Sequence, residues 1–260
     1  MITVRESYYD KEKQRPKTLL WKNSENGIAQ VWKYYPNGQQ KSIKNYKNGQ
    51  LDSDSYEYYE TGELKSYLNY RNGILHGIFE KGYPNGKVQE RGMYFMGNLH
   101  DKYTSYYDNG TIKDDLRYDD GDKHGYCFTY YPDGKIKTLS YYKHGVLDGP
   151  YEENYENGMQ RLTSCYKKGL LQGDYKSFHE NGKLKHRCFY HHGILNGVSK
   201  HYDKDGNLLR SVIYRDGQEM DETLKPISYF RYPSGLSYTF DGKTPPPIPV
   251  INKKSTSGER

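Results

Sequence analysis

Glycine recurs along most of this chain with a fixed period of 24 residues. One series comprises Gly38, Gly62, Gly86, Gly110, Gly134, Gly158, Gly182 and Gly206. A second comprises Gly49, Gly73, Gly97, Gly121, Gly145, Gly169, Gly193 and Gly217. Because eight units match without an insertion, the period defines a repeat protein in which each unit is one supersecondary element stacked on the next.

Each glycine ends a turn signal, such as Pro36-Asn37-Gly38 in the first series and Lys47-Asn48-Gly49 in the second. Proline presets the first turn position, Asn or Asp suits the second, and glycine takes the left-handed third. Both series therefore predict hairpin loops of three residues with a G1 bulge. The unit then divides into strands of about 8 and 10 residues joined by these turns.

A third glycine follows the second-series glycine by four residues in several units. It is Gly77, Gly125, Gly149, Gly173 or Gly197, whereas Ser53, Asp101 and Asp221 replace it elsewhere. Because strands of unequal length cannot pair evenly, we expect a bulge here that absorbs the surplus residues of the longer strand.

The pattern predicts an all-β fold, namely an elongated single-layer antiparallel β-meander solenoid of tandem 24-residue β-hairpin repeats. No segment has a long helical period, and no connection is long enough for a parallel crossover. Hydrophobic residues make up only 33% of the chain, and no apolar run approaches the roughly 20 residues of a membrane-spanning helix. Disorder is disfavoured because 15% of the residues are aromatic.

The repeat also predicts the domain boundaries. Residues 1–26 fit a degenerate N-terminal capping repeat, and residues 27–220 contain the regular units. Residues 221–243 are expected to form a C-terminal capping hairpin, followed by a flexible Pro-rich polar tail over 244–260.

Alternation along the strands separates two faces of the sheet. The positions 2, 4, 6 and 8 residues after the first glycine carry most aliphatic side chains, so we expect them on the packed face. Between the two glycines of every unit stands a tyrosine that shares this face and is expected to form a structural ladder. These tyrosines are Tyr46, Tyr70, Tyr94, Tyr118, Tyr142, Tyr166, Tyr190 and Tyr214.

The opposite face is predicted to carry a basic column and a strip of tyrosines. The column, a candidate site for anions or lipid headgroups, comprises Lys41, Lys65, Lys113, Lys137, Arg161 and Lys185. The strip, a candidate protein-docking surface, comprises Tyr35, Tyr59, Tyr83, Tyr107, Tyr131 and Tyr155. A solvated, charge-paired face is the simpler interpretation of the column, since Glu57 and Glu153 are expected across from Lys65 and Arg161.

The spacing Tyr-x-x-Gly-x-x-x-Gly, seen over residues 70–77 and 142–149, resembles the MORN repeat. With its Tyr-x-x-Asn-Gly-Lys continuation it is most similar to the 24-residue MORN variant of antitoxin-like bacterial and viral proteins. The resemblance covers roughly residues 27–220 and implies a twisted single sheet used in assembly, in some relatives at membranes or phosphoinositides. The sequence departs from the pattern at Ser53, Asp101, His179 and Asp203.

No catalytic constellation is evident, so we expect neither an enzyme nor a cofactor. The three cysteines lack CxxC spacing, which disfavours a disulfide framework or a zinc cluster. The repeat-equivalent His76, His100 and His124 should be about 10 Å apart, two strands from one another. They are too distant to share a metal ion whose ligands lie about 2 Å away. The net charge of +6 is too mixed to favour specific nucleic-acid binding.

We therefore predict a non-enzymatic scaffold that mediates protein–protein interaction or self-association. The alternatives are a peripheral membrane adaptor acting through the basic column and a carbohydrate-binding aromatic ladder. The resemblance adds an antitoxin-like binder. The N-terminus lacks the apolar region of a secretory signal, which favours a cytoplasmic protein.

Overall fold

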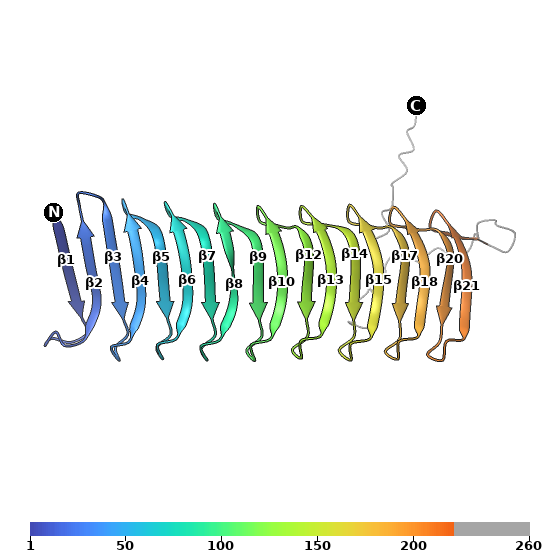
Figure 1. Ribbon diagram of the computed structural model, residues 1–260, viewed down its shortest axis with the longest axis horizontal. Helices are drawn as coiled ribbons and strands as arrows, with labels where there is room; N and C mark the ends of the chain where they lie inside the picture. The colour runs from blue at the N-terminus through green and yellow to red at the C-terminus, as the bar shows by residue number, and fades with distance from the viewer. Residues whose placement is uncertain (221–260) are drawn as a thin grey trace, which may run out of the picture. The chain divides into compact units, whose positions relative to one another are not determined.

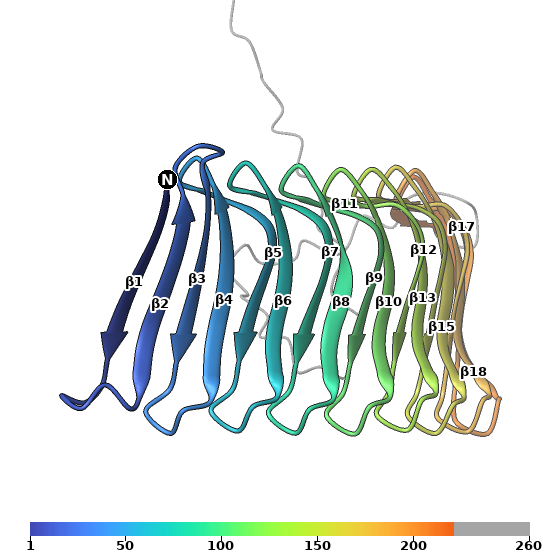
Figure 2. The ribbon, with the colours of Figure 1, turned by 60° about the vertical axis from the view of Figure 1, so that its left-hand side comes forward.

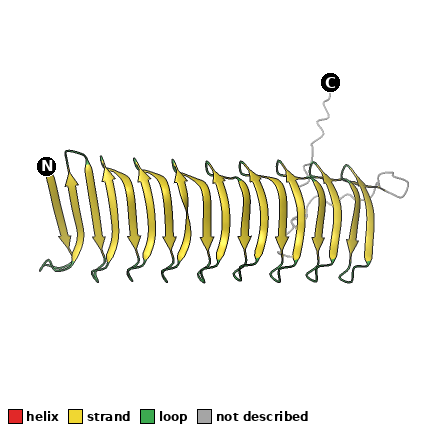
Figure 3. Ribbon diagram, in the orientation of Figure 1, coloured by secondary structure: helices red, strands yellow, loops and turns green. Residues whose placement is uncertain are grey.

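A computed structural model describes residues 1–220. These residues form one open antiparallel sheet of 22 strands and contain no helix (Figures 1 and 3). The predicted single-layer β-meander is thereby confirmed. The expected capping hairpin at 221–243 and the tail at 244–260 lie outside the described residues.

The strands follow one another along the chain. They are β1 (Ile2–Tyr8), β2 (Pro16–Asn23), β3 (Ile28–Tyr34), β4 (Gln40–Lys47), β5 (Gln50–Tyr58), β6 (Leu64–Arg71), β7 (Ile74–Gly82), β8 (Val88–Phe95), β9 (Asn98–Tyr106), β10 (Ile112–Asp119), β11 (Asp122–Lys123), β12 (Gly125–Tyr130), β13 (Ile136–Lys143), β14 (Val146–Asn154), β15 (Gln160–Lys167), β16 (Leu170–Leu171), β17 (Gly173–Phe178), β18 (Leu184–His191), β19 (Ile194–Leu195), β20 (Gly197–Tyr202), β21 (Leu208–Arg215) and β22 (Gln218–Met220).

Each strand pairs with its neighbours in sequence. In three hairpins a bulge divides the second strand into two, and β11, β16 and β19 are the short pieces next to the turn. For this reason β10 pairs with β9 on one side and with both β11 and β12 on the other. Residues 1–26 continue the pattern, because β1 pairs with β2 and β2 pairs in unbroken register with β3. Figure 2 shows that the strands bend near one of the two loop edges.

The first-series turns have the predicted three-residue loop. In the first of them the Tyr35 N–H donates to the Gln39 carbonyl (2.8 Å), and the Gly38 N–H donates to the Tyr35 carbonyl (3.0 Å). Gly38 has φ of 87°, which places it in the left-handed region. This is a type I turn followed by a G1 bulge, as proline and glycine at these positions favour.

The prediction of the same loop for the second series is wrong. Lys47 pairs directly with Gln50, so Asn48 and Gly49 alone form the turn. Their φ angles are 51° and 82°, and two successive left-handed residues define a type I′ hairpin. No proline precedes the Asn-Gly pair, and a type I′ turn matches the right-handed twist of the strands better than a type I turn. The strands β4 and β5 consequently contain 8 and 9 residues.

The predicted bulge at the third glycine is confirmed. Leu68 pairs with Phe79 and Tyr70 pairs with Leu75, so three residues around Gly77 oppose one residue of β6. Gly77 has φ of 105°, and Ser53 takes the same left-handed region at 72°. Gly149 differs, because its φ is not positive. A Cβ atom at this position would lie 2.8 Å from the Tyr141 Cβ, so close packing requires the glycine.

The hairpin tips beyond this bulge contact the preceding repeat. The Gly97 N–H donates to the Leu75 carbonyl (2.8 Å), and Gly145 does the same to Lys123 (2.9 Å). A Cβ atom on Gly97 would lie 3.4 Å from Cγ2 of Ile74 in the preceding tip. The second-series glycine therefore serves both the left-handed turn and the close approach of one tip to the next.

The buried side chains lie mainly on the predicted packed face. Residues 2 to 9% exposed include Leu116, Leu162, Val212 and Ser199, and Cys127 and Cys188 are 1% exposed. Tyrosines of the ladder pack diagonally against a ring on the adjacent strand. These pairs are Phe79–Tyr94, Tyr103–Tyr118, Tyr151–Tyr166 and Tyr175–Tyr190, with ring centroids 4.7, 6.1, 5.9 and 6.0 Å apart. Burial raises the pKa of Tyr175 to about 12.

Exchanging the residues at one bulge position tests the left-handed geometry. We expect Ser53→Gly to raise the free energy of unfolding by about 1 kcal/mol, because a side chain with positive φ is strained. Gly77→Ser should lower it by about the same amount. Urea denaturation followed by circular dichroism measures both variants, and an equal loss in both would contradict the explanation.

Candidate functional site

The tyrosines of the predicted docking strip link neighbouring repeats. Each hydroxyl donates to a backbone carbonyl 23 residues further along the chain. The bonds are Tyr35 to Tyr58 (3.0 Å), Tyr59 to Gly82 (3.0 Å), Tyr83 to Tyr106 (2.8 Å), Tyr107 to Tyr130 (2.8 Å), Tyr131 to Asn154 (2.8 Å) and Tyr155 to Phe178 (2.8 Å). His179 replaces tyrosine and keeps the contact, with Nε2 3.0 Å from the Tyr202 carbonyl.

These rings are half-buried, and burial raises the pKa of Tyr107, Tyr131 and Tyr155. Each of their hydroxyls donates a hydrogen bond to a backbone carbonyl, so the strip has a structural role. The sequence pattern predicts such a role only for the other tyrosine series, which includes Tyr46 and Tyr70. The docking role of the strip stays a prediction.

The basic column lies beside this strip and is largely exposed. The ammonium groups of Lys41, Lys113 and Lys137 lie over the rings of the strip, 5.2, 6.0 and 5.7 Å from the centroids of Tyr35, Tyr107 and Tyr131. Cations over aromatic faces are attracted by the ring quadrupole. Half of the column therefore stabilises the rings next to it.

The ion pairs of this region differ in part from the expectation. Glu57 lies 3.0 Å from Lys44 rather than across from Lys65, whereas Glu153 does contact Arg161 (3.2 Å). In the register of the strands, Glu57 pairs with Ser66 and Tyr58 with Leu64, so Lys65 is skipped. The column position is thus the skipped residue of the turn bulge and has no residue directly across from it.

A cluster of aromatic side chains occupies the outer face, which is the face opposite the packed one. We call Tyr126, Phe128, Leu139 and Tyr141 the central aromatic patch. Tyr126 pairs with Tyr141 and Phe128 with Leu139, while Cys127 between them points to the packed face. The Tyr126 ring is 5.0 Å from Tyr141 in an edge-on arrangement and 6.4 Å from Phe128. Half of Tyr126 is exposed (50%).

A second cluster lies nearer the N-terminus on the same face. Trp32 pairs with Ile43, Ile43 with Tyr56, and Tyr56 with Tyr67. The rings of Tyr56 and Tyr67 are 5.1 Å apart. Charged residues separate the two clusters, and among them Lys102 contacts Asp115 (3.3 Å). The outer face therefore alternates between aromatic and charge-paired bands.

These clusters were not recognised in the sequence because their residues do not repeat every 24 positions. Equivalent positions in other units carry Pro150 and Glu152, or Lys102 and Thr104, in place of Tyr126 and Phe128. The available signal was the alternation of rings within a single predicted hairpin, on the face that lacks the ladder.

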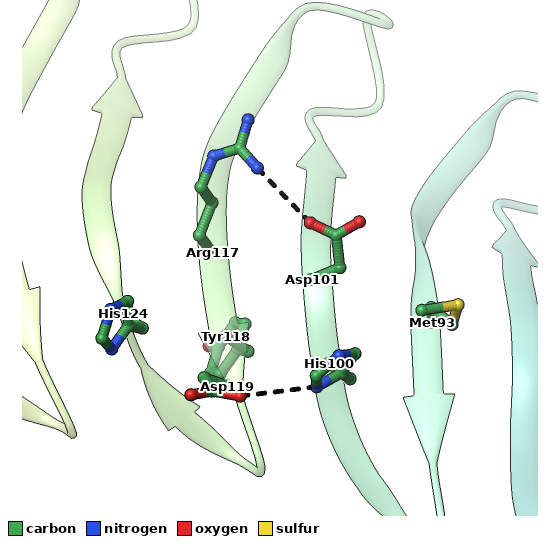
Figure 4. A pocket seen from close by; sticks show the side chains of 7 residues that line it. All are labelled: Met93, His100, Asp101, Arg117, Tyr118, Asp119 and His124. Atoms are coloured by element: carbon green, nitrogen blue, oxygen red, sulfur yellow. Dashed lines mark hydrogen bonds and ion pairs between the residues drawn. The ribbon is translucent and has the colours of Figure 1, made fainter.

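The repeat-equivalent histidines line up near the bent edge. His100 and His124 border a hollow of about 300 Å³ together with Arg117 and Asp119 (Figure 4). Nδ1 of His100 lies 3.8 Å from a carboxylate oxygen of Asp119.

A different pair, His186 and His201, stacks on the packed face with ring centroids 4.0 Å apart. Burial and the neighbouring His201 lower the pKa of His186 to about 4. The ring is therefore neutral around pH 7 and serves packing, with Nε2 2.9 Å from the Ser199 hydroxyl.

Among residues 1–220 there is no helix long and apolar enough to cross a membrane. The fold of residues 1–220 is that of a β-hairpin repeat protein whose described part forms a single sheet. The family model described as MORN repeat variant matches five segments, at residues 51–72, 75–95, 123–144, 171–192 and 195–216. The chain belongs to the MORN repeat variant family, as its Tyr-Gly spacing predicted.

No curated protein matches the chain. Among solved structures, "Crystal Structure of TcdB2-TccC3-TEV" is 14% identical with a TM-score of 0.24, over 89% of this chain and 14% of that one. The Tc holotoxin pore of Photorhabdus luminescens is 12% identical with a TM-score of 0.22, over 85% of this chain and 16% of that one. This chain thus spans about a seventh of the length of those chains, and no function is transferred from them.

Removing one hydroxyl of the strip tests its structural role. We expect Tyr131→Phe to lower the free energy of unfolding by about 1 kcal/mol, because the Asn154 carbonyl loses its donor. Tyr126→Phe is the matched control, since the structure gives its hydroxyl no hydrogen bond within the described residues. Urea denaturation measures both, and equal stabilities would show that the inter-repeat bond adds nothing.

Proposed function

We propose that the chain is a non-enzymatic scaffold that binds a protein partner on the outer face, at the central aromatic patch. The family membership supports a repeat scaffold in general terms. The observation that carries the finer proposal is the edge-on pair of Tyr141 and the half-exposed Tyr126, on a sheet face that no second layer covers within residues 1–220.

Aromatic side chains are enriched among the interface residues that contribute most of the binding energy. A charged rim around them favours one orientation of the partner. The central aromatic patch has both features, because the Lys102–Asp115 pair lies on the neighbouring strands on one side and Glu152 pairs with Leu139 on the other. The strands beneath it are fixed by bonds to both neighbouring repeats. A partner would therefore meet a surface that loses little conformational freedom on binding.

The other candidates draw less support from the contacts. In the basic column three cations lie over tyrosine rings and Arg161 pairs with Glu153, so a lipid headgroup would compete with existing interactions. A carbohydrate ladder would need rings exposed along the repeat, whereas the strip tyrosines are half-buried.

The proposal is tested by affinity capture from the native source, with the full chain as bait. We expect Tyr126→Ser combined with Tyr141→Ser to lose a partner that the wild type retains, with an unchanged circular dichroism spectrum. Val198→Ser is the control, because Val198 has the same position in another unit and is similarly exposed (47%).

Two further arms distinguish the alternatives. Loss of the partner with Tyr107→Ser but not with the patch variant would move the docking surface to the tyrosine strip. Salt-sensitive co-sedimentation with phosphatidylserine vesicles, abolished by Lys65→Gln with Lys185→Gln, would support the membrane adaptor instead.

A further inference from the structure

Three potential metal ligands from adjacent hairpins meet at the bent edge of the sheet. Asp119 ends β10, His124 lies between β11 and β12, and His144 is in the turn after β13. One ligand atom from each lies within 4.8 Å of the other two. Figure 4 shows Asp119 between His124 and His100.

The contact between hairpin tips brings these residues together. The Gly145 N–H donates to the Lys123 carbonyl (2.9 Å), which sets His144 beside His124. Likewise, the Gly121 N–H donates to the Leu99 carbonyl (2.8 Å). This bond holds the hairpin tip that contains Asp119 beside His100. The distance between repeat-equivalent histidines predicts that they cannot share an ion with one another. Their neighbours come instead from the next hairpin tip: Asp119 lies beside His100, and His144 lies beside His124.

The position of His124 normally carries an acceptor for the next tip. Asp52 accepts from the Asn72 N–H (2.9 Å), Asp148 from Lys168 (3.0 Å), and Gln172 from His192 (3.0 Å). At His124 the Nδ1 atom is buried and has no hydrogen-bond partner among the described residues. Buried polar atoms are rarely left without a partner, and a bound ion is one explanation for such an atom.

Two cations near the Asp119 carboxylate interact with other groups. Arg117 lines the same hollow but pairs with Asp101 (3.3 Å). Lys123 directs its ammonium group over the Tyr142 ring, 5.2 Å from the centroid. Asp119 contacts the imidazole of His100, whose Nδ1 is 3.8 Å away.

We propose that Asp119, His124 and His144 bind a zinc ion that bridges two neighbouring repeats. Two imidazoles and a carboxylate are a donor set that suits Zn²⁺, which takes four ligands tetrahedrally. His100, on the other side of Asp119, or water completes the set. Zinc ligands stand roughly 3.5 Å apart, so the present spread closes with side-chain movements of about 1 Å. This inference is independent of the proposed protein partner.

The site is tested on the full chain after treatment with a chelator and dialysis. Calorimetric titration with ZnCl₂ should show one ion bound per chain, and zinc should raise the midpoint of thermal unfolding. Cobalt as a probe should give the intense visible bands of a tetrahedral site without sulfur-to-metal charge transfer. A sulfur band would place the ion at a cysteine and overturn the assignment.

Substitutions that other repeats already carry keep the variants foldable. Position 172 is Gln and position 72 is Asn, so His124→Gln and His144→Asn use natural equivalents. Each, and Asp119→Asn, should weaken zinc binding roughly 10-fold or more. The matched controls are His76→Gln and His192→Asn, at the same repeat positions in other units, and both should bind zinc like the wild type.

Two results would overturn the proposal. The first is the absence of calorimetric binding by the wild type, together with an unfolding midpoint that zinc does not change. The second is wild-type affinity in both His124→Gln and His144→Asn, which would place the bound zinc elsewhere on the chain.

Discussion

Contact between consecutive hairpins is the interaction on which this structure depends. A sheet with a single layer cannot bury both of its faces, so each unit relies on its neighbours. Besides the strand pairing itself, two side ladders join the units. At the bent edge a tip glycine donates to the preceding repeat, and at the other edge a tyrosine hydroxyl donates to the following one. Both ladders make one bond per unit at a fixed position, which accounts for the 24-residue period.

The sequence was sufficient to predict the fold because repetition amplifies weak local signals. A single Pro36-Asn37-Gly38 suggests a turn, and eight turns in phase define a meander. The error at the second turn arose because glycine alone was assigned the left-handed position. Asn48, like Met96 and His144 at equivalent positions, is also left-handed, and only the register of the strands shows this.

The candidate sites were harder to predict for a related reason. Residues that repeat in most units, such as Tyr107 and Tyr131, hold the units together. Chemistry that distinguishes one unit from another lies in residues that occur in only one or two units, such as Tyr126 or His144. Their neighbours come from other hairpins, and the offset between hairpins is set by the bend at the bulge rather than by strand spacing. Pattern alone does not give that offset.

The two side ladders also run in opposite senses along the stack. At the tips, Asn48 in the first unit and the glycines from Gly73 to Gly217 in the others donate toward the N-terminal side. The tyrosines of the other edge donate toward the C-terminal side. The stack of hairpins over residues 1–220 therefore has polarity, because one ladder donates toward its N-terminal side and the other toward its C-terminal side. A copy added end to end would find complementary groups only head to tail, so growth by this route is vectorial, as in a filament with unlike ends.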